Sequence, residues 1–452
     1  MLHIRDQISP QYELASIAEN LYGGPALFFD NVAGNPIPVV ANIYSRKRMA
    51  RLFGVEEKEL IPHIISSVRS AIRNPMLPVL VASGACQGVV VTENIDLKAM
   101  LPNLTQTPHD SGDYIGACVV IWRFPDSGLR SMFYSRGTTK GGDRFQLFFH
   151  ALRGLTVAYR EAERLGRPLQ VAAVIGPEPA VAIAAAAHGP LVESIEGEYK
   201  LLLAGSLAGR PIEMVRCKTI DLEVPARSEI VIEAEMMPGA REWTDSLNPT
   251  GILGPGGSGY FSRSKELPVC VARAVTQRKG PIYEAFFGKQ GFSIVNLLPE
   301  AAMTEEIRQI ARRQFVDLNY RHPIVIIKFK KESGTDDGVP KNVLMRALSA
   351  DRDCHMAIVV DDDIDINDPW AVWTAVATRT NWKTGFFIVP SARGHAVVPV
   401  AREQEGLVDK VAIDSTVPFG MREKFKVNEF VPVEVSRFMA NFAPRPWYEH
   451  GG

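Results

Sequence analysis

One group of side chains that could bind a metal ion is an acidic run that directly follows an apolar stretch. Its members are Asp361, Asp362, Asp363 and Asp365. Carboxylates at the C-terminal end of a strand can hold a hard cation. The alternative is a solvated strand end that leads into a helix capped by Asp368 and Pro369. The run alone is a weak signal and favours the capped strand end.

Other candidate side chains have equally ordinary interpretations. His150 lies in the apolar stretch FFHALRG, where a lone histidine is more often a hydrogen-bonded core residue than a metal ligand. Arg136, in YSRGTTKGG, would ordinarily be a surface charge. The glycine-rich GILGPGGSGYF permits close approach of the backbone to a ligand, but it lacks the flanking strand and helix of a dinucleotide fingerprint. None of these features decides a function by itself.

Three regions of different hydrophobic pattern must position these side chains. Residues 1–104 alternate helix-like and strand-like stretches and predict an N-terminal α/β region. Residues 105–295 are richer in strands, and residues 296–452 alternate strand and helix, which predicts a C-terminal α/β domain with a mainly parallel sheet. The fold class is therefore mixed α/β.

The central region contains three local predictions. YIGACVVIWRF and LRSMFYSR are apolar runs separated by PDSG and predict a β-hairpin. FQLFFHALRGLTVAYREAERLG predicts one helix that ends at Gly166. VPARSEIVIEAEM alternates polar and apolar residues, as expected for a strand with one wet face. A sheet or open barrel with inserted helices fits this pattern.

Composition excludes several classes of partner. The chain has 452 residues, 46% of them hydrophobic, and 50 basic against 51 acidic side chains give a net charge of −1. This charge balance provides no electrostatic attraction for a nucleic acid or for an anionic membrane. No signal-like N-terminus and no apolar run of about 18 residues is present, which predicts a cytoplasmic protein. The five scattered cysteines are expected to be reduced core residues.

Several stretches, taken in order, resemble the UbiD-type decarboxylases, with a likeness that runs from about residue 113 to residue 418. They are AVIGPEPAVAIAAA, EYKLLLAGSLAGRPIEMVRCKTIDLEVPARSEIVIEAE, PVCVARAVTQRKGPIY, AIVVDDDIDINDPWAVWTAVATRT and KVAIDSTVP. The resemblance implies a central split β-barrel that binds prenylated FMN, with Mn²⁺ and K⁺ at the flavin phosphate. It also implies a flavin prenyltransferase as cofactor supplier and a C-terminal domain that takes part in a homodimer or a multiple of dimers.

The resemblance also implies roles for particular residues. Ser131, His150 and Glu198 match the family's metal ligands, with Glu196 as an alternative to Glu198. Arg136 matches the catalytic arginine, which would orient the substrate carboxylate beside the flavin. Lys410 matches a lysine that approaches the flavin phosphate, so Arg136, His150 and Lys410 are the expected cofactor-binding residues.

The chain departs from the family at its acid–base segment. The family carries an EGPFGE-like stretch with two carboxylates, whereas NPTGILGPGGSGYFSR contains no Asp or Glu. Either water or a hydroxyl such as Ser258 or Tyr260 delivers the proton, or ordinary decarboxylation has been lost. The expected function is therefore that of a carboxy-lyase, which removes CO₂ from an aromatic, heteroaromatic or conjugated unsaturated acid in a reaction that can also run in reverse. The alternative is a non-catalytic subunit that binds flavin or a partner in a carboxylase complex.

Overall fold

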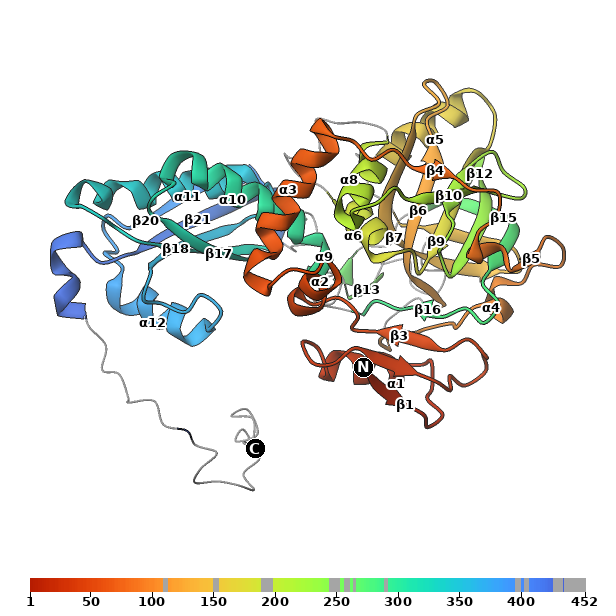
Figure 1. Cartoon of the computed structure of the whole chain (residues 1–452), viewed down its shortest axis with the longest axis horizontal. Helices are drawn as coiled ribbons and strands as arrows, with labels where there is room; N and C mark the ends of the chain where they lie inside the picture. The colour runs from red at the N-terminus through yellow and green to blue at the C-terminus, as the bar shows by residue number, and fades with distance from the viewer. Residues whose placement is uncertain are drawn as a thin grey trace.

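The computed structural model describes residues 1–108, 113–148, 154–187, 198–243, 253–255, 261–262, 266–287, 292–394, 400–401, 406–425 and 434. Figure 1 shows the C-terminal domain on the left and the central barrel on the right, with helices α3 and α10 between them. The N-terminal sheet lies below the barrel in this view.

The N-terminal part forms a small sheet with helices beside it. Its strand order is β1-β2-β3-β16, so a strand from much later in the chain completes the sheet. Helix α3 is amphipathic, since Leu60, Ile61, Ile64 and Ile65 share one buried face. The elements are β1 Leu2–Ile4, α1 Glu13–Asn20, β2 Leu27–Phe29, β3 Val39–Ala41, α2 Arg46–Leu52, α3 Leu60–Arg73, β4 Val79–Leu80, β5 Val89–Val91 and α4 Leu97–Met100.

The central part is a closed six-stranded barrel, in the order β12-β9-β6-β7-β8-β15, that closes where β12 pairs with β15. The predicted mixed α/β fold with a central barrel is thus confirmed, and the barrel is closed where the local pattern had suggested a sheet or an open barrel. The strands are β6 Tyr114–Arg123, β7 Arg130–Gly141, β8 Arg144–Leu147, β9 Leu169–Ile175, β12 Ile230–Trp243 and β15 Glu266–Gln277. The other elements are α5 Gly154–Arg164, α6 Pro179–Ala186, α8 Tyr199–Ala208, β10 Glu213–Arg216, β11 Glu223–Pro225, β13 Leu253–Pro255, β14 Phe261–Ser262, β16 Tyr283–Glu284 and α9 Phe292–Val295.

Two hydrophobic cores lie on opposite faces of the barrel sheet. Alternate residues of β6 and β7, among them Val119 and Met132, pack against the layer formed by α3, α6 and α8. Their sequence neighbours Val120 and Phe133 belong to the second core, which also contains residues of α5 and of the N-terminal sheet. The face on which a β7 side chain lies therefore decides which of these two environments it meets.

The local predictions for the barrel are correct with two exceptions. The hairpin around PDSG joins β6 to β7, and the alternating stretch forms the first part of β12. The wet face expected for that stretch is wrong, because Glu233 is fully buried and accepts hydrogen bonds from the backbone N–H groups of Lys218 and Thr219. The single helix predicted over residues 145–166 is wrong, because its first residues form β8 and only α5 is helical. β8 pairs with β7 and β15, and the buried Gln146 amide donates hydrogen bonds to the carbonyl oxygens of Glu242 (2.7 Å) and Leu267 (2.9 Å). Pairing on both sides thus overrides the local helical pattern.

The C-terminal domain is the predicted α/β unit, with a five-stranded sheet in the order β17-β18-β19-β21-β20. The prediction of a mainly parallel sheet holds for β18, β19 and β21 but is wrong for the edges, where β17 and β20 run antiparallel to their neighbours. Only two residues separate β17 from β18, and such a short connection forces an antiparallel pair. The elements are α10 Leu297–Ala311, β17 Phe315–Arg321, β18 Ile324–Phe329, α11 Val339–Ala350, β19 Met356–Asp361, α12 Pro369–Arg379, β20 Phe386–Arg393 and β21 Leu407–Ser415.

The cysteines match their prediction. All five are free thiols, Cys217 is half-buried, and the buried ones are Cys86, Cys118, Cys270 and Cys354. Among the described segments, no helix has the length and apolar character needed to span a membrane.

Candidate active site

Arg136 lies in β7 on the face of the strand that α6 and α8 cover. Side chains alternate along a strand, so Arg136 shares this face with Tyr134 and Met132, which belongs to the helix-covered core. The Arg136 guanidinium lies 5.2 Å from the centre of the Phe148 ring. The Phe148 N–H donates a 2.8 Å hydrogen bond to the Arg136 carbonyl oxygen, which holds the middle of β7 beside Phe148. Arg136 is half-buried, and among the described residues none accepts a hydrogen bond from its guanidinium, so its nitrogens can bind a carboxylate.

Two of the three predicted metal ligands can be placed, and the structure does not bring them together. Glu198 precedes the first residue of α8, and its Oε1 atom accepts a 2.9 Å hydrogen bond from Nε of Arg130. Arg130 also donates a 2.8 Å hydrogen bond to Glu223. Ser131 lies opposite Trp122 in the β6–β7 pair, on the other face of β7 from Arg130. The Ser131 hydroxyl and the Glu198 carboxylate are therefore on opposite sides of the sheet.

The third predicted ligand, His150, lies outside the described residues, as do Glu196, Ser258 and Tyr260. Lys410 lies in β21 of the C-terminal domain, with 4% of its surface exposed. Its ammonium donates hydrogen bonds to the carbonyl oxygens of Leu348 (2.9 Å) and Asp351 (3.2 Å). For Lys410 to contact a flavin phosphate, its ammonium would have to give up these two hydrogen bonds.

The acidic run forms ion pairs and a helix cap in this structure. Arg379 donates 2.9 Å and 2.8 Å hydrogen bonds to Asp361 and Asp363, and Asp362 pairs with Arg422. The Asp368 side chain caps α12 by accepting a hydrogen bond from the Trp370 N–H at 2.9 Å. The capped strand end is thus the interpretation that the geometry supports. Within the described parts of the chain, no cluster of three or more His, Cys, Asp or Glu side chains is arranged to hold a metal ion.

A buried carboxylate that the sequence analysis missed lies close to the Arg136 face of β7. Glu284 is the last residue of β16 and is 3% exposed. The Tyr134 hydroxyl donates a 3.0 Å hydrogen bond to its Oε1 atom. Phe286 stacks on Tyr44 at 5.4 Å between ring centres and meets Tyr134 edge-on at 5.3 Å. The available signal was a lone glutamate in the otherwise apolar stretch PIYEAFF, which only a partner from another strand could explain.

The environment of Glu284 makes it a proton-holding group. Desolvation raises the pKa of Glu284 to about 7, although Tyr134 and Tyr44 favour the charged form. Burial and the neighbouring Glu284 raise the pKa of both tyrosines, which stay protonated. A carboxyl group with a pKa near neutrality can both give and take a proton. This is the property that the glycine-rich segment lacks.

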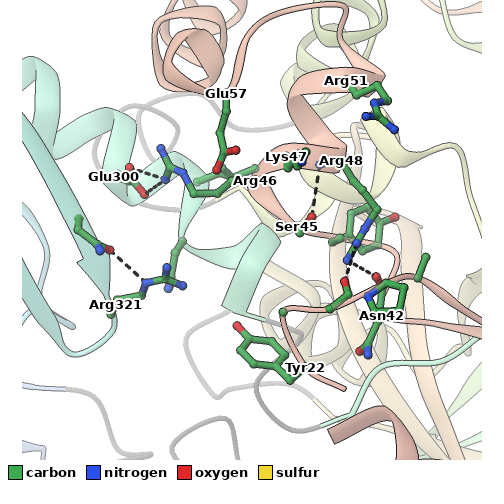
Figure 2. A pocket seen from close by; sticks show the side chains of 18 of the residues that line it. Tyr22, Asn42, Ser45, Arg46, Lys47, Arg48, Arg51, Glu57, Glu300 and Arg321 are labelled. Carbon is green, nitrogen blue, oxygen red and sulfur yellow. Dashed lines mark hydrogen bonds and ion pairs between the residues drawn. The ribbon is translucent and has the colours of Figure 1, made fainter. Parts of the chain in front are cut away.

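A pocket of about 720 Å³ lies between the N-terminal and C-terminal domains (Figure 2). Tyr44 lines the pocket and also belongs to the Glu284 cluster, so it connects the two. The pocket walls come from α2, from the start of α10 and from the end of β17. Arg46 of α2 bridges to Glu300 of α10 through two 2.7 Å hydrogen bonds, which join the two domains at the pocket.

Comparisons with known proteins identify the family. Models of the N-terminal, Rift-related and C-terminal domains of 3-octaprenyl-4-hydroxybenzoate carboxy-lyase, named UbiD, match residues 1–68, 79–290 and 293–415. The chain belongs to the UbiD family. The UbiD-class enzyme HmfF from Pelotomaculum thermopropionicum, solved in complex with FMN, superposes with a TM-score of 0.84 at 31% identity over 98% of this chain and 96% of that one.

Other UbiD relatives are named decarboxylases. An apo 3,4-dihydroxybenzoic acid decarboxylase from Enterobacter cloacae has a TM-score of 0.88 at 27% identity and covers 97% of this chain and 95% of its own. Gallate decarboxylase from Lactiplantibacillus plantarum is 26% identical over 91% of this chain and 87% of its own. The predicted family membership is therefore confirmed over nearly the whole length, and with it the assignment to carboxy-lyases.

Proposed function

We propose that this UbiD-family carboxy-lyase removes CO₂ from an aromatic, heteroaromatic or conjugated unsaturated acid with the aid of prenylated FMN, in a reversible reaction. The observation that carries the proposal is that Arg136 lies on the same face of β7 as Tyr134, whose hydroxyl donates a hydrogen bond to the buried Glu284 of β16. The decarboxylases among the relatives support the substrate class.

Arg136 binds and orients the substrate carboxylate. A guanidinium forms two parallel hydrogen bonds with a carboxylate, which fixes the carboxyl group relative to the rest of the substrate. Phe148 packs against the guanidinium and limits its rotation. The prenylated flavin, when bound, supplies the electron sink for the carbon–carbon cleavage.

Glu284 and Tyr134 supply the proton that replaces CO₂. Near neutral pH the Glu284 carboxyl is partly protonated because of its burial. Tyr134 is hydrogen-bonded to Glu284 and lies two residues from Arg136 on the same face of β7. A proton can pass from the Glu284 carboxyl through the Tyr134 hydroxyl toward the substrate side. This route is an alternative to the water molecule or the Ser258 or Tyr260 hydroxyl expected from the sequence.

The metal ions and partners belong to the same proposal. His150 and Glu198 would hold Mn²⁺ at the flavin phosphate, with K⁺ beside it, because imidazole and carboxylate ligands suit manganese. The structure limits the third ligand, since Ser131 points to the other face of β7 and Arg130 engages one oxygen of Glu198. The flavin would come from a flavin prenyltransferase, and the active unit would be a homodimer or a multiple of dimers.

The test is release of CO₂ from a panel of aromatic and conjugated acids by protein made beside a flavin prenyltransferase. Arg136→Ala should abolish turnover and leave the melting temperature nearly unchanged, because the Arg136 side chain is only half-buried where it contacts the Phe148 ring. Arg144→Ala, at a half-exposed arginine of the neighbouring strand β8 that pairs with Glu242, is the matched control and should keep activity. Binding of flavin without turnover of any acid would instead support the non-catalytic alternative.

A further inference from the structure

We infer that the pocket between α2, α10 and β17 is a binding site for a small organic anion that carries at least two negative charges. The inference does not rest on the proposed function, because it uses neither Arg136 nor Glu284. Five cationic and two acidic side chains line the pocket, an excess of three positive charges in a protein whose net charge is −1. They are Arg46, Lys47, Arg48, Arg51, Arg321, Glu57 and Glu300.

The two acidic side chains of the pocket lining are already counted in this excess, and they are too few to balance the five cations. Glu300 is 4% exposed and is matched by Arg46, whose guanidinium contacts both carboxylate oxygens at 2.7 Å. Burial raises the pKa of Glu300, and the positive charges of Arg46 and Arg321 oppose this rise. Glu57 is exposed, and it is the single carboxylate of the pocket lining that remains for the other four cations.

Arg48 is held at the pocket by backbone groups and not by an acid. Its guanidinium donates hydrogen bonds to the carbonyl oxygens of Ile43 (3.1 Å), Gly24 (2.9 Å) and Asn42 (2.5 Å). Desolvation lowers the pKa of Arg48, which is the signature of a positive charge that is partly removed from water without a counter-ion. A bound anion would supply the missing negative charge.

The remaining cations approach the pocket from two sides. In Figure 2, Arg321 extends from β17 of the C-terminal domain, while Lys47 and Arg51 come from α2 of the N-terminal part. Arg321 uses its Nε atom to donate a 3.1 Å hydrogen bond to Asn319, which orients the side chain and leaves its terminal nitrogens for a ligand. A ligand with two anionic groups can contact both sides, whereas a monoanion can contact only one.

The size and lining of the pocket favour a small molecule. A volume of about 720 Å³ lies in the range that holds a metabolite-sized ligand, roughly 300–1,000 Å³. Tyr22 and Tyr44 add aromatic surface for an organic body. Because one wall belongs to each domain, occupation of the pocket would also hold the C-terminal domain against α2.

The experiment is calorimetric titration of the purified protein with pyrophosphate, at constant ionic strength, beside inorganic phosphate and the monoanion benzoate. We expect pyrophosphate to bind at one site and more tightly than benzoate. Arg321→Gln and the double variant Lys47→Gln with Arg51→Gln should each weaken pyrophosphate binding by at least about tenfold, as the loss of charge-assisted hydrogen bonds predicts. Glu57→Gln should strengthen it.

The matched control is Lys58→Gln, which removes an exposed lysine next to Glu57 that is not part of the pocket lining. This variant should bind pyrophosphate as the unmodified protein does. Two results would overturn the inference: pyrophosphate that binds no more tightly than benzoate, or pyrophosphate binding that is equal in the Arg321 and Lys58 variants.

Discussion

Replacement of Glu284 by glutamine should change how the stability of the protein depends on pH. In the unfolded chain this carboxyl titrates near its ordinary pKa of 4.5, and burial raises the folded value to about 7. The folded state therefore binds the proton more tightly, so its stability falls as pH rises from about 4.5 through about 7 and then becomes constant. At about 1.4 kcal/mol per pKa unit, the difference between the folded and unfolded pKa values of Glu284 corresponds to about 3 kcal/mol of stability.

Glu284→Gln removes this titration and keeps the shape of the side chain. Near pH 5 the variant should match the unmodified protein or be slightly less stable, because the new side chain adds an amide N–H₂ that must find partners. Near pH 8 its free energy of unfolding should exceed that of the unmodified protein by up to about 3 kcal/mol. Decarboxylation should fall at the same time, since the proton-holding group is gone.

The assay is urea unfolding at several pH values between about 5 and 8, followed by tryptophan fluorescence, since Trp122 is buried in the barrel next to β7. Glu93→Gln, at an exposed glutamate, controls for the loss of one negative charge. Tyr134→Phe should move the pH transition upward, because the tyrosine hydrogen bond lowers the pKa of Glu284. A difference between Glu284→Gln and the unmodified protein that stays constant from about pH 5 to about pH 8 would refute the reasoning.

Three further predictions concern other residues. His150→Ala should lose flavin and manganese together, measured by absorbance and metal analysis, and retention of both would contradict its predicted ligand role. Arg379→Gln should destabilise the C-terminal domain by about 3 kcal/mol in urea unfolding, because the buried Asp361 loses its charged partner; an unchanged transition would show that the pair contributes little. Lys410→Met should lower stability by about 1–2 kcal/mol and retain flavin, since the lysine serves two buried carbonyl oxygens; flavin loss with unchanged unfolding would place Lys410 at the phosphate.

The glycine-rich segment shows why the proposed acid–base group, Glu284, could not be found from local sequence. The absence of Asp and Glu between residues 248 and 262 is a fact of the sequence, and it raised the question of a substitute. Glu284 lies far along the chain, in a two-residue strand that pairs with β3 of the N-terminal sheet. Its contact with Tyr134 exists only because β3, β7 and β16 meet in the folded protein.

The elements that the sequence alone determined are those whose signals are local. Alternation along β12, the turn residues between β6 and β7, and the strand–helix alternation after residue 296 lie within short windows of chain, and side-chain periodicity follows directly from backbone geometry. The family resemblance rests on the same kind of local pattern. Tertiary structure decided the rest: β8 became a strand because two partners lay beside it, and Arg130 of β7 met Glu198 at the start of α8. Tertiary structure also formed the cationic pocket, because α2 and Arg321 approach each other only when the two domains pack. The free energy of such contacts depends on distances between residues that are far apart in the sequence, and no short stretch of sequence contains these distances.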